Sequence, residues 1–111
     1  MTNIKHENDP TSHAEVVAIR NACKKLNAAY LEECVLYTTF EPCPMCAAAA
    51  IWANMKGIVF GATMFDAKVK LGNNFSWRQI NIRCRDILKE EVPKLELTEE
   101  YMHDECVKLL G

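Results

Sequence analysis

Residues 34–53, "CVLYTTFEPCPMCAAAAIWA", constrain the fold more than any other stretch, because they join two kinds of secondary structure without a spacer. Residues 34–39 are β-branched and aromatic, which is typical of a strand. Pro44 follows at a position where the first turn of a helix accepts proline, since the missing N–H has no helical partner there. The alanines after it predict a helix to about Met55, ending at Gly57. A strand leading directly into a helix is typical of layered α/β domains.

The rest of the chain continues this alternation. In residues 12–27, apolar residues recur at steps of three and four, which predicts an amphipathic helix. Residues 57–62 are a continuous apolar run and predict a buried strand. The elements expected after it are a loop, a helix, a strand and a closing helix, over residues 70–75, 77–91, 94–98 and 99–110. The sequence therefore predicts a single α/β domain over residues 1–111.

Composition excludes several classes of protein. Half of the 111 residues are apolar, yet no apolar run approaches the roughly 20 residues that cross a bilayer. The N-terminus lacks the apolar stretch of a signal peptide, so we expect a cytoplasmic protein with no membrane partner. The formal charge of −2 shows no basic bias, which argues weakly against nucleic acid as the main partner.

Two of the six cysteines require an explanation. The other four lie in apolar periodic segments, where free buried thiols are common: Cys23, Cys34, Cys84 and Cys106. Cys43 and Cys46 form a C-x-x-C pair at the start of a helix. That position lowers thiol pKa and suits a redox pair, but it also directs two thiolates to one side, as a metal site requires. A purely structural pair is the third interpretation.

His13 and Glu15 lie at the start of the first expected helix. A histidine and two cysteines are good zinc ligands, and three protein ligands leave the fourth position of a catalytic zinc to water. Glu15 could then accept a proton from that water. In simpler interpretations, Ser12 and Glu15 form a capping box and His13 is an ordinary surface residue. The combination of H-x-E with P-C-x-x-C favours zinc, because it is the signature of zinc deaminases that act on nucleobases.

The segments "NDPTSHAEVVAIRNAC" and "LYTTFEPCPMCAAAAIWA" resemble the cytidine and deoxycytidylate deaminase superfamily, specifically its branch of guanine, tRNA adenosine and yeast-type cytosine deaminases. The likeness covers about residues 8–67. It implies that His13, Cys43 and Cys46 bind Zn²⁺ and that Glu15 is the catalytic proton shuttle. The implied reaction replaces a ring amino group by a carbonyl and releases ammonia. The implied fold has three layers, with a mixed β-sheet flanked by helices.

The resemblance says less about the substrate. The segment "TMFDAKVKLGNNFSW" is more similar to guanine deaminases, which implies base contacts from Asp66 and Phe75. For Asp66, a solvated loop carboxylate is an equal alternative. Three arginines are expected to form a solvated helix face rather than an RNA contact: Arg78, Arg83 and Arg85. We expect a nucleobase or nucleoside substrate, with a guanine-type free base favoured over cytosine or a tRNA adenosine.

The N-terminus departs from the family pattern. A helix and a β-hairpin precede the H-x-E motif in the family, whereas twelve residues precede His13 here. Asn3 lies near the place of a substrate-binding asparagine of the family. Without the hairpin, the strand over residues 34–39 would expose an edge, so we expect a homodimer or higher oligomer. Rival functions are an inactive zinc-binding remnant or partner subunit, and a thiol oxidoreductase in which Cys43 and Cys46 cycle as a disulfide.

Overall fold

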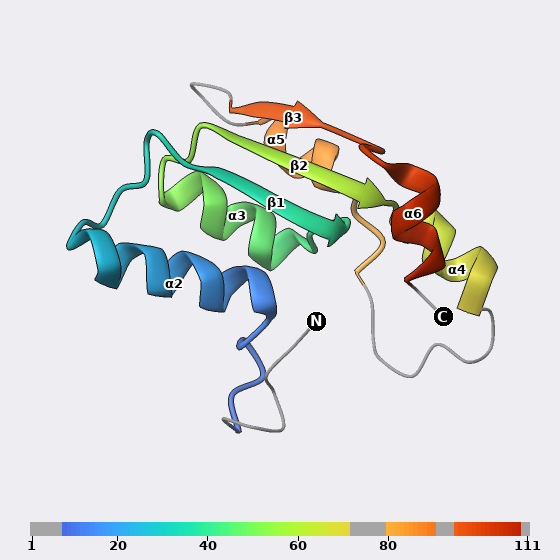
Figure 1. The fold of residues 1–111 in the computed structure, drawn as a ribbon, viewed down its shortest axis with the longest axis horizontal. Helices are drawn as coiled ribbons and strands as arrows, with labels where there is room; N and C mark the ends of the chain where they lie inside the picture. The colour runs from blue at the N-terminus through green and yellow to red at the C-terminus, as the bar shows by residue number, and fades with distance from the viewer. Residues whose placement is uncertain (1–7, 72–79, 91–94, 110–111) are drawn as a thin grey trace.

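A parallel β-sheet organises the fold of the computed structural model, which describes residues 8–71, 80–90 and 95–109 (Figure 1). Its strands lie side by side in chain order, as β1 (Val35–Phe40), β2 (Gly57–Ala62) and β3 (Glu96–Thr98). The expectation of a mixed sheet is wrong for these strands, since both pairs are parallel. Parallel pairing arises because helices return the chain from the end of one strand to the start of the next.

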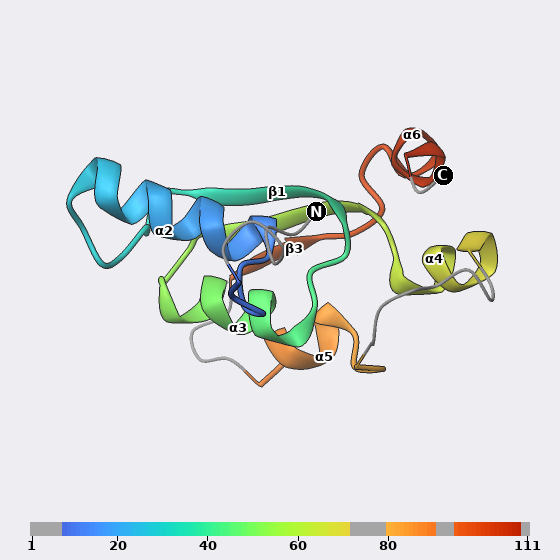
Figure 2. The ribbon, with the colours of Figure 1, turned by 90° about the horizontal axis from the view of Figure 1, so that it is seen from below.

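The helices in the described residues are α2 (Ala14–Leu26), α3 (Pro44–Trp52), α4 (Met64–Leu71), α5 (Cys84–Leu88) and α6 (His103–Lys108). Figure 2 shows α3 and α5 on one side of the sheet, α2 along the edge formed by β1, and α6 on the other side near the C-terminal ends of the strands. Helix α2 packs against α3, α3 against α5, and α6 against β2. The three expected layers are therefore present in part, with one face of the sheet covered much more fully.

The main core lies between the sheet and α3. Ile58 and Phe60 of β2 are fully buried, and Leu36 of β1 lies in the same cluster. They pack near Ala47 and Ala50, whose small side chains let α3 approach the strands closely. Burying each large apolar side chain contributes roughly 1.5–3 kcal/mol. This cluster holds α3 against the sheet and so fixes the helix that begins after Cys43.

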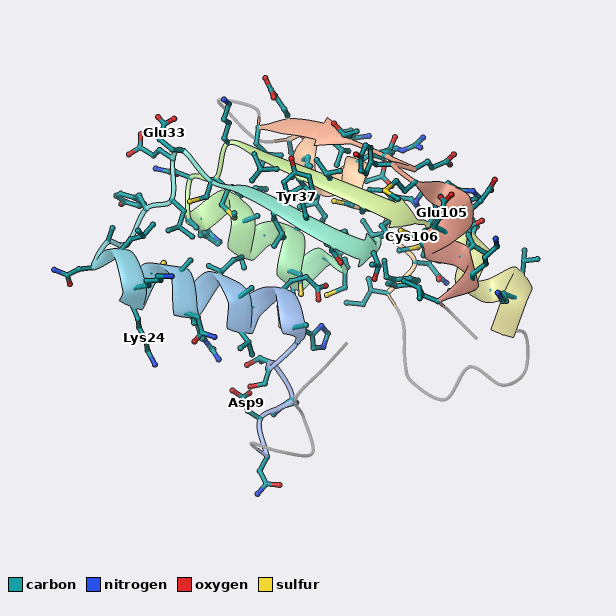
Figure 3. All side chains as sticks on the ribbon, in the orientation of Figure 1. Asp9, Lys24, Glu33, Tyr37, Glu105 and Cys106 are labelled. Atoms are coloured by element: carbon teal, nitrogen blue, oxygen red, sulfur yellow. The ribbon has the colours of Figure 1, made fainter. Side chains whose placement is uncertain are left out.

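The opposite face of the sheet is more open. Tyr37 stands on this face of β1 with 69% of its surface exposed (Figure 3). At the far end of the same face, Gly61 of β2 meets α6 so closely that a Cβ there would collide with Cys106. Glycine is therefore required at this position for α6 to dock on the strand.

The expected elements are found with shifted boundaries. The first helix and the first two strands lie within one or two residues of the expected ranges. The closing helix begins at His103 rather than at residue 99, because Glu100 and Met102 adopt positive φ angles of 58° and 49°. The helix expected over 77–91 is described only in part, and its helical turn there covers Cys84–Leu88.

Helix α4 begins immediately after β2, where the sequence analysis expected no element before the loop over 70–75. Its start is a capping box: Asp66 donates its backbone N–H to Thr63 Oγ1 at 3.1 Å and accepts from the Thr63 N–H at 2.7 Å. The T-x-x-D spacing was the available signal for this helix.

Within the described residues, β1 pairs with β2 and with no other strand, so its outer edge has no neighbouring strand. The oligomer therefore stays a prediction, and the outer edge of β1 is the place where a strand of a second copy would pair. No helix in the described ranges is both long and apolar enough to span a membrane.

Candidate metal centre

Two helices begin side by side at the C-terminal end of β1 (Figure 1). His13 precedes the first residue of α2, and Cys43 precedes the first residue of α3. Both have extended backbone angles, with φ/ψ of −69°/151° and −68°/168°, and neither side chain caps its own helix. Pro44 occupies the first turn of α3 as expected. The two side chains are therefore free to face a common point between the helix ends.

The donor atoms of His13, Cys43 and Cys46 lie within 4.8 Å of one another. The Sγ atoms of both cysteines are 3.6 Å from His13 Nδ1. A tetrahedral zinc with bonds of about 2.3 Å to sulfur and about 2.0 Å to nitrogen places the nitrogen and each sulfur about 3.5 Å apart. The two nitrogen–sulfur distances of this His-Cys-Cys cluster thus match those expected around a zinc ion.

Glu15 lies on the first turn of α2 and is 6% exposed. Its carboxylate shares a hydrogen bond with the Cys46 thiol, and burial raises the pKa of Glu15 above its ordinary value. The helix cap is His13 rather than Ser12, so the structure does not show the capping box considered for Ser12 and Glu15. A buried carboxylate therefore lies directly beside the ligand cluster.

The two thiols of the cluster differ in acidity. A hydrogen bond from Cys46 lowers the pKa of Cys43 to about 5. The same contact, together with burial, raises the pKa of Cys46. Metal binding would release the remaining thiol protons, because thiolates are the ligands. All six cysteines lie in the described residues and are free thiols.

Asp66 belongs to the β2–α4 corner instead of a solvated loop. Besides completing the capping box with Thr63, its Oδ2 lies 2.8 Å from His103 Nε2 on α6. Partial burial acts against it, but hydrogen bonds from Thr63 and His103 lower the pKa of Asp66. A contact from Asp66 to a base stays a prediction. Phe75 and Asn3 lie outside the described residues.

A buried ion pair near the cluster was not expected from the sequence. Arg83 was expected on a solvated face, yet its Nε lies 3.0 and 2.9 Å from the two carboxylate oxygens of Glu41. Glu41 is fully buried, two residues before Cys43. Arg85 fits the expectation better, since it is exposed and pairs with Glu99; Arg78 lies outside the described residues. The available signal was an acid directly after an apolar strand and directly before a proline.

Comparison with known proteins places these residues in a family. The model of the family described as MafB19-like deaminase matches residues 1–96. The guanine deaminase of Bacillus subtilis (strain 168) is 46% identical over 80 residues, which are 71% of this chain and 51% of that protein. A tRNA-specific adenosine deaminase of Buchnera aphidicola subsp. Schizaphis graminum is 36% identical over 105 residues, covering 95% of this chain and 63% of that protein.

Solved structures show the same likeness. A guanine deaminase from Nitrosomonas europaea matches 99% of this chain and 60% of its own, with a TM-score of 0.77 and 25% identity. A structure from a study of tRNA:A34 deaminases matches 97% of this chain and 72% of its own, with a TM-score of 0.67 and 25% identity. The chain thus spans about half the length of the Bacillus relative. From the family match and these relatives, the chain belongs to the MafB19-like deaminases, within the cytidine and deoxycytidylate deaminase superfamily.

Proposed function

We propose that this chain is a zinc-dependent deaminase domain that hydrolyses the amino group of a nucleobase or nucleoside, with a guanine-type free base favoured. One observation carries the proposal: His13, Cys43 and Cys46 have the donor spacing of a tetrahedral zinc site, and the buried Glu15 adjoins them. Family membership supports the same reaction class.

His13, Cys43 and Cys46 would hold the metal and leave one position open to solvent or substrate. A zinc ion bound by three protein ligands lowers the pKa of its water to about 7, which supplies hydroxide near neutral pH. The proton transfers of the reaction are then carried out by the protein's own side chains.

Glu15 is the group that moves protons in this proposal. Its carboxylate takes one proton from water and delivers it to the ring nitrogen beside the amino-bearing carbon. It then passes the second proton of that water to the departing amino group, which leaves as ammonia. The water oxygen bonds to the ring carbon, the bond from that carbon to the amino nitrogen breaks, and a carbonyl remains while Glu15 returns to its starting state. Its burial keeps bulk water from competing for these protons.

Two substrates are supported to different degrees. The 46% identity to a guanine deaminase favours guanine. A second candidate is a tRNA adenosine, because the 36% identity to a tRNA-specific adenosine deaminase extends over 95% of the chain. A homologous structure with a TM-score of 0.82 holds 8-azaguanine, which adds support for a purine base.

The deciding experiment measures ammonia release by the zinc-loaded protein. The substrates are guanine, adenine, cytosine, their nucleosides and a tRNA anticodon stem-loop. Glu15→Gln is the test variant, and Glu33→Gln is the matched control, since Glu33 is an exposed carboxylate outside the cluster. We expect turnover of guanine that falls at least about 100-fold in Glu15→Gln while the bound zinc is retained.

Each rival function gives a different result. An inactive zinc-binding remnant binds zinc at His13, Cys43 and Cys46 but releases no ammonia from any substrate. A thiol oxidoreductase oxidises Cys43 and Cys46 to a disulfide and reduces it in turn, with no need for Glu15. Turnover of the stem-loop alone would replace guanine by a tRNA adenosine as the substrate.

A further inference from the structure

Glu41 is a buried charge that the proposed reaction does not use. Its side chain has no exposed surface, although a carboxylate costs several kcal/mol to bury unless it is paired. It accepts hydrogen bonds from the backbone N–H of Met64 at 2.9 Å, the backbone N–H of Cys84 at 2.8 Å, and Arg83 Nε. The carboxylate is thus fully occupied by donors and is not available as a metal ligand.

The backbone of Glu41 is fixed as firmly as its side chain. Its N–H donates to Ala62 O at 2.8 Å, which extends the pairing of β1 with β2 by one residue. Pro42 follows and is fully buried, and proline restricts the residue before it to extended conformations. Cys43 comes next and begins the turn into α3. Only this stiff proline separates the carboxylate from a residue of the His-Cys-Cys cluster.

The donors to Glu41 come from parts of the chain far from residue 41. Met64 is the first residue of α4, and Cys84 is the first residue of α5. Arg83 also lies over the ring of Phe65, at 5.0 Å from its centroid, and 3.8 Å from Glu99. One carboxylate therefore joins the end of β1 to the starts of two helices.

We propose that Glu41 is a positioning residue of the metal centre. By joining the end of β1 to α4 and α5, it sets the direction in which Cys43 presents its sulfur to His13 and Cys46. This inference rests on the proposed function, because it assumes that the cluster binds a metal. In other metal sites, substituting a residue that orients a ligand without binding the metal typically lowers metal affinity by about 10–100-fold.

The test titrates metal-free protein with Co²⁺ and Zn²⁺ against a chromophoric chelator and records the Co²⁺ absorption spectrum. Glu41→Gln keeps the shape of the side chain and removes its charge. Ile58→Val is the control, because Ile58 is a fully buried core residue that pairs near the start of β1, away from Cys43. We expect metal affinity about 10–100-fold lower in Glu41→Gln with an altered cobalt spectrum. Ile58→Val should bind like the wild type.

Arg83→Lys provides a second route to the same answer. It keeps the positive charge but loses the planar donor that faces both oxygens of Glu41. We expect a smaller loss of affinity in the same direction, and this variant decides the matter if Glu41→Gln does not fold. Folded variants with wild-type affinity and spectrum overturn the positioning role alone. Wild-type protein that binds neither metal overturns the proposed function, and this inference with it.

Discussion

The two corners that follow neighbouring strands are built alike but behave differently. At the β1 corner, residues 40–44, Glu41 accepts backbone N–H groups and pairs with Arg83. At the β2 corner, residues 62–66, Asp66 accepts a backbone N–H and pairs with His103. The Glu41 side chain is 0% exposed, whereas that of Asp66 is 24% exposed. One carboxylate is sealed inside the fold, and the other is in contact with water.

The choice of cation matches this difference in burial. An arginine keeps its charge at any physiological pH, so a buried partner is never left unpaired. A histidine loses its charge near neutral pH, which is tolerable only where water can solvate the remaining carboxylate. Cys43 of the His-Cys-Cys cluster lies on the β1 corner, whose ion pair is permanent, and Cys46 follows in the first turn of α3. The ion pair nearest to the cluster in sequence is therefore one that stays charged, whereas the pH-sensitive pair belongs to the β2 corner.

Glu41→Ala should give the largest loss of stability. Removing one partner of a buried ion pair leaves Arg83 largely buried without its main partner, which costs roughly 3–5 kcal/mol. Urea unfolding of metal-free protein measures this loss. A loss no greater than that from Asp66→Ala at the β2 corner would contradict the difference drawn between the two corners.

Cys46→Ser should remove the stabilisation that zinc gives. At free zinc about 100 times its dissociation constant, binding to the folded state alone adds about 2.7 kcal/mol. The urea midpoint of the wild type should therefore rise with zinc, and that of Cys46→Ser should not. The matched control is Cys106→Ser, since Cys106 is a thiol on α6 outside the cluster. An equal response to zinc in both variants would assign the effect to another site.

Thr63→Ala tests the contribution of the capping box at the β2 corner. The Thr63 hydroxyl accepts the Asp66 N–H at the start of α4, and losing such a cap typically costs about 1 kcal/mol. We expect a modest shift of the urea midpoint with an unchanged zinc affinity. A loss of zinc affinity would show that the hydrogen bond from the Met64 N–H to Glu41 carries the change from the β2 corner to the cluster.

The smallest expected effect is a pH dependence confined to the β2 corner. Hydrogen bonds that the His103 ring donates to Asp66 and Asp104 raise the pKa of His103 above 6.5. Partial burial acts to raise the pKa of Asp66, but hydrogen bonds from Thr63 and His103 lower it. The histidine's contribution is complete below its unfolded pKa and is lost as pH rises through the folded value. The aspartate's contribution is lost as pH falls through its own lowered value. The pair therefore stabilises most between these limits.

Hydrogen exchange in α6 at about pH 5.5 and about pH 8.5 checks this expectation. Protection should be higher at the lower pH in the wild type, and His103→Gln should remove that difference. Other groups that titrate in this range are unchanged in the variant, so the comparison isolates His103. Equal pH dependence in both proteins would contradict the assignment.

Local signals were sufficient for the parts of the molecule that depend on local structure. Periodicity placed α2, and the apolar run at 57–62 placed β2. Motif spacing brought together His13, Cys43 and Cys46, which the structure places within 4.8 Å. Helix α4 was not predicted, although its T-x-x-D capping box is present in the sequence, because residues 70–75 that follow are typical of a loop.

Features that depend on tertiary contacts could not be predicted in this way. The pairing of Glu41 with Arg83 joins residues 42 apart, and no local pattern encodes such a partner. The late start of α6 depends on positive φ angles at Glu100 and Met102, where neither residue type favours that conformation. The parallel sheet was expected as mixed because the resemblance to the family, and not the residues themselves, supplied that detail.

The separation of the ligands along the chain has a consequence for how the centre assembles during folding. Cys43 and Cys46 come together as soon as the first turn of α3 forms, whereas His13 lies 30 residues from Cys43. His13 arrives only when α2 docks on α3, after a long loop has closed. Glu15 belongs to the same helix as His13 and arrives with it. If the proposed function holds, a nascent chain can therefore bind a metal loosely by two thiolates, whereas His13 and the proposed proton carrier Glu15 are delivered together.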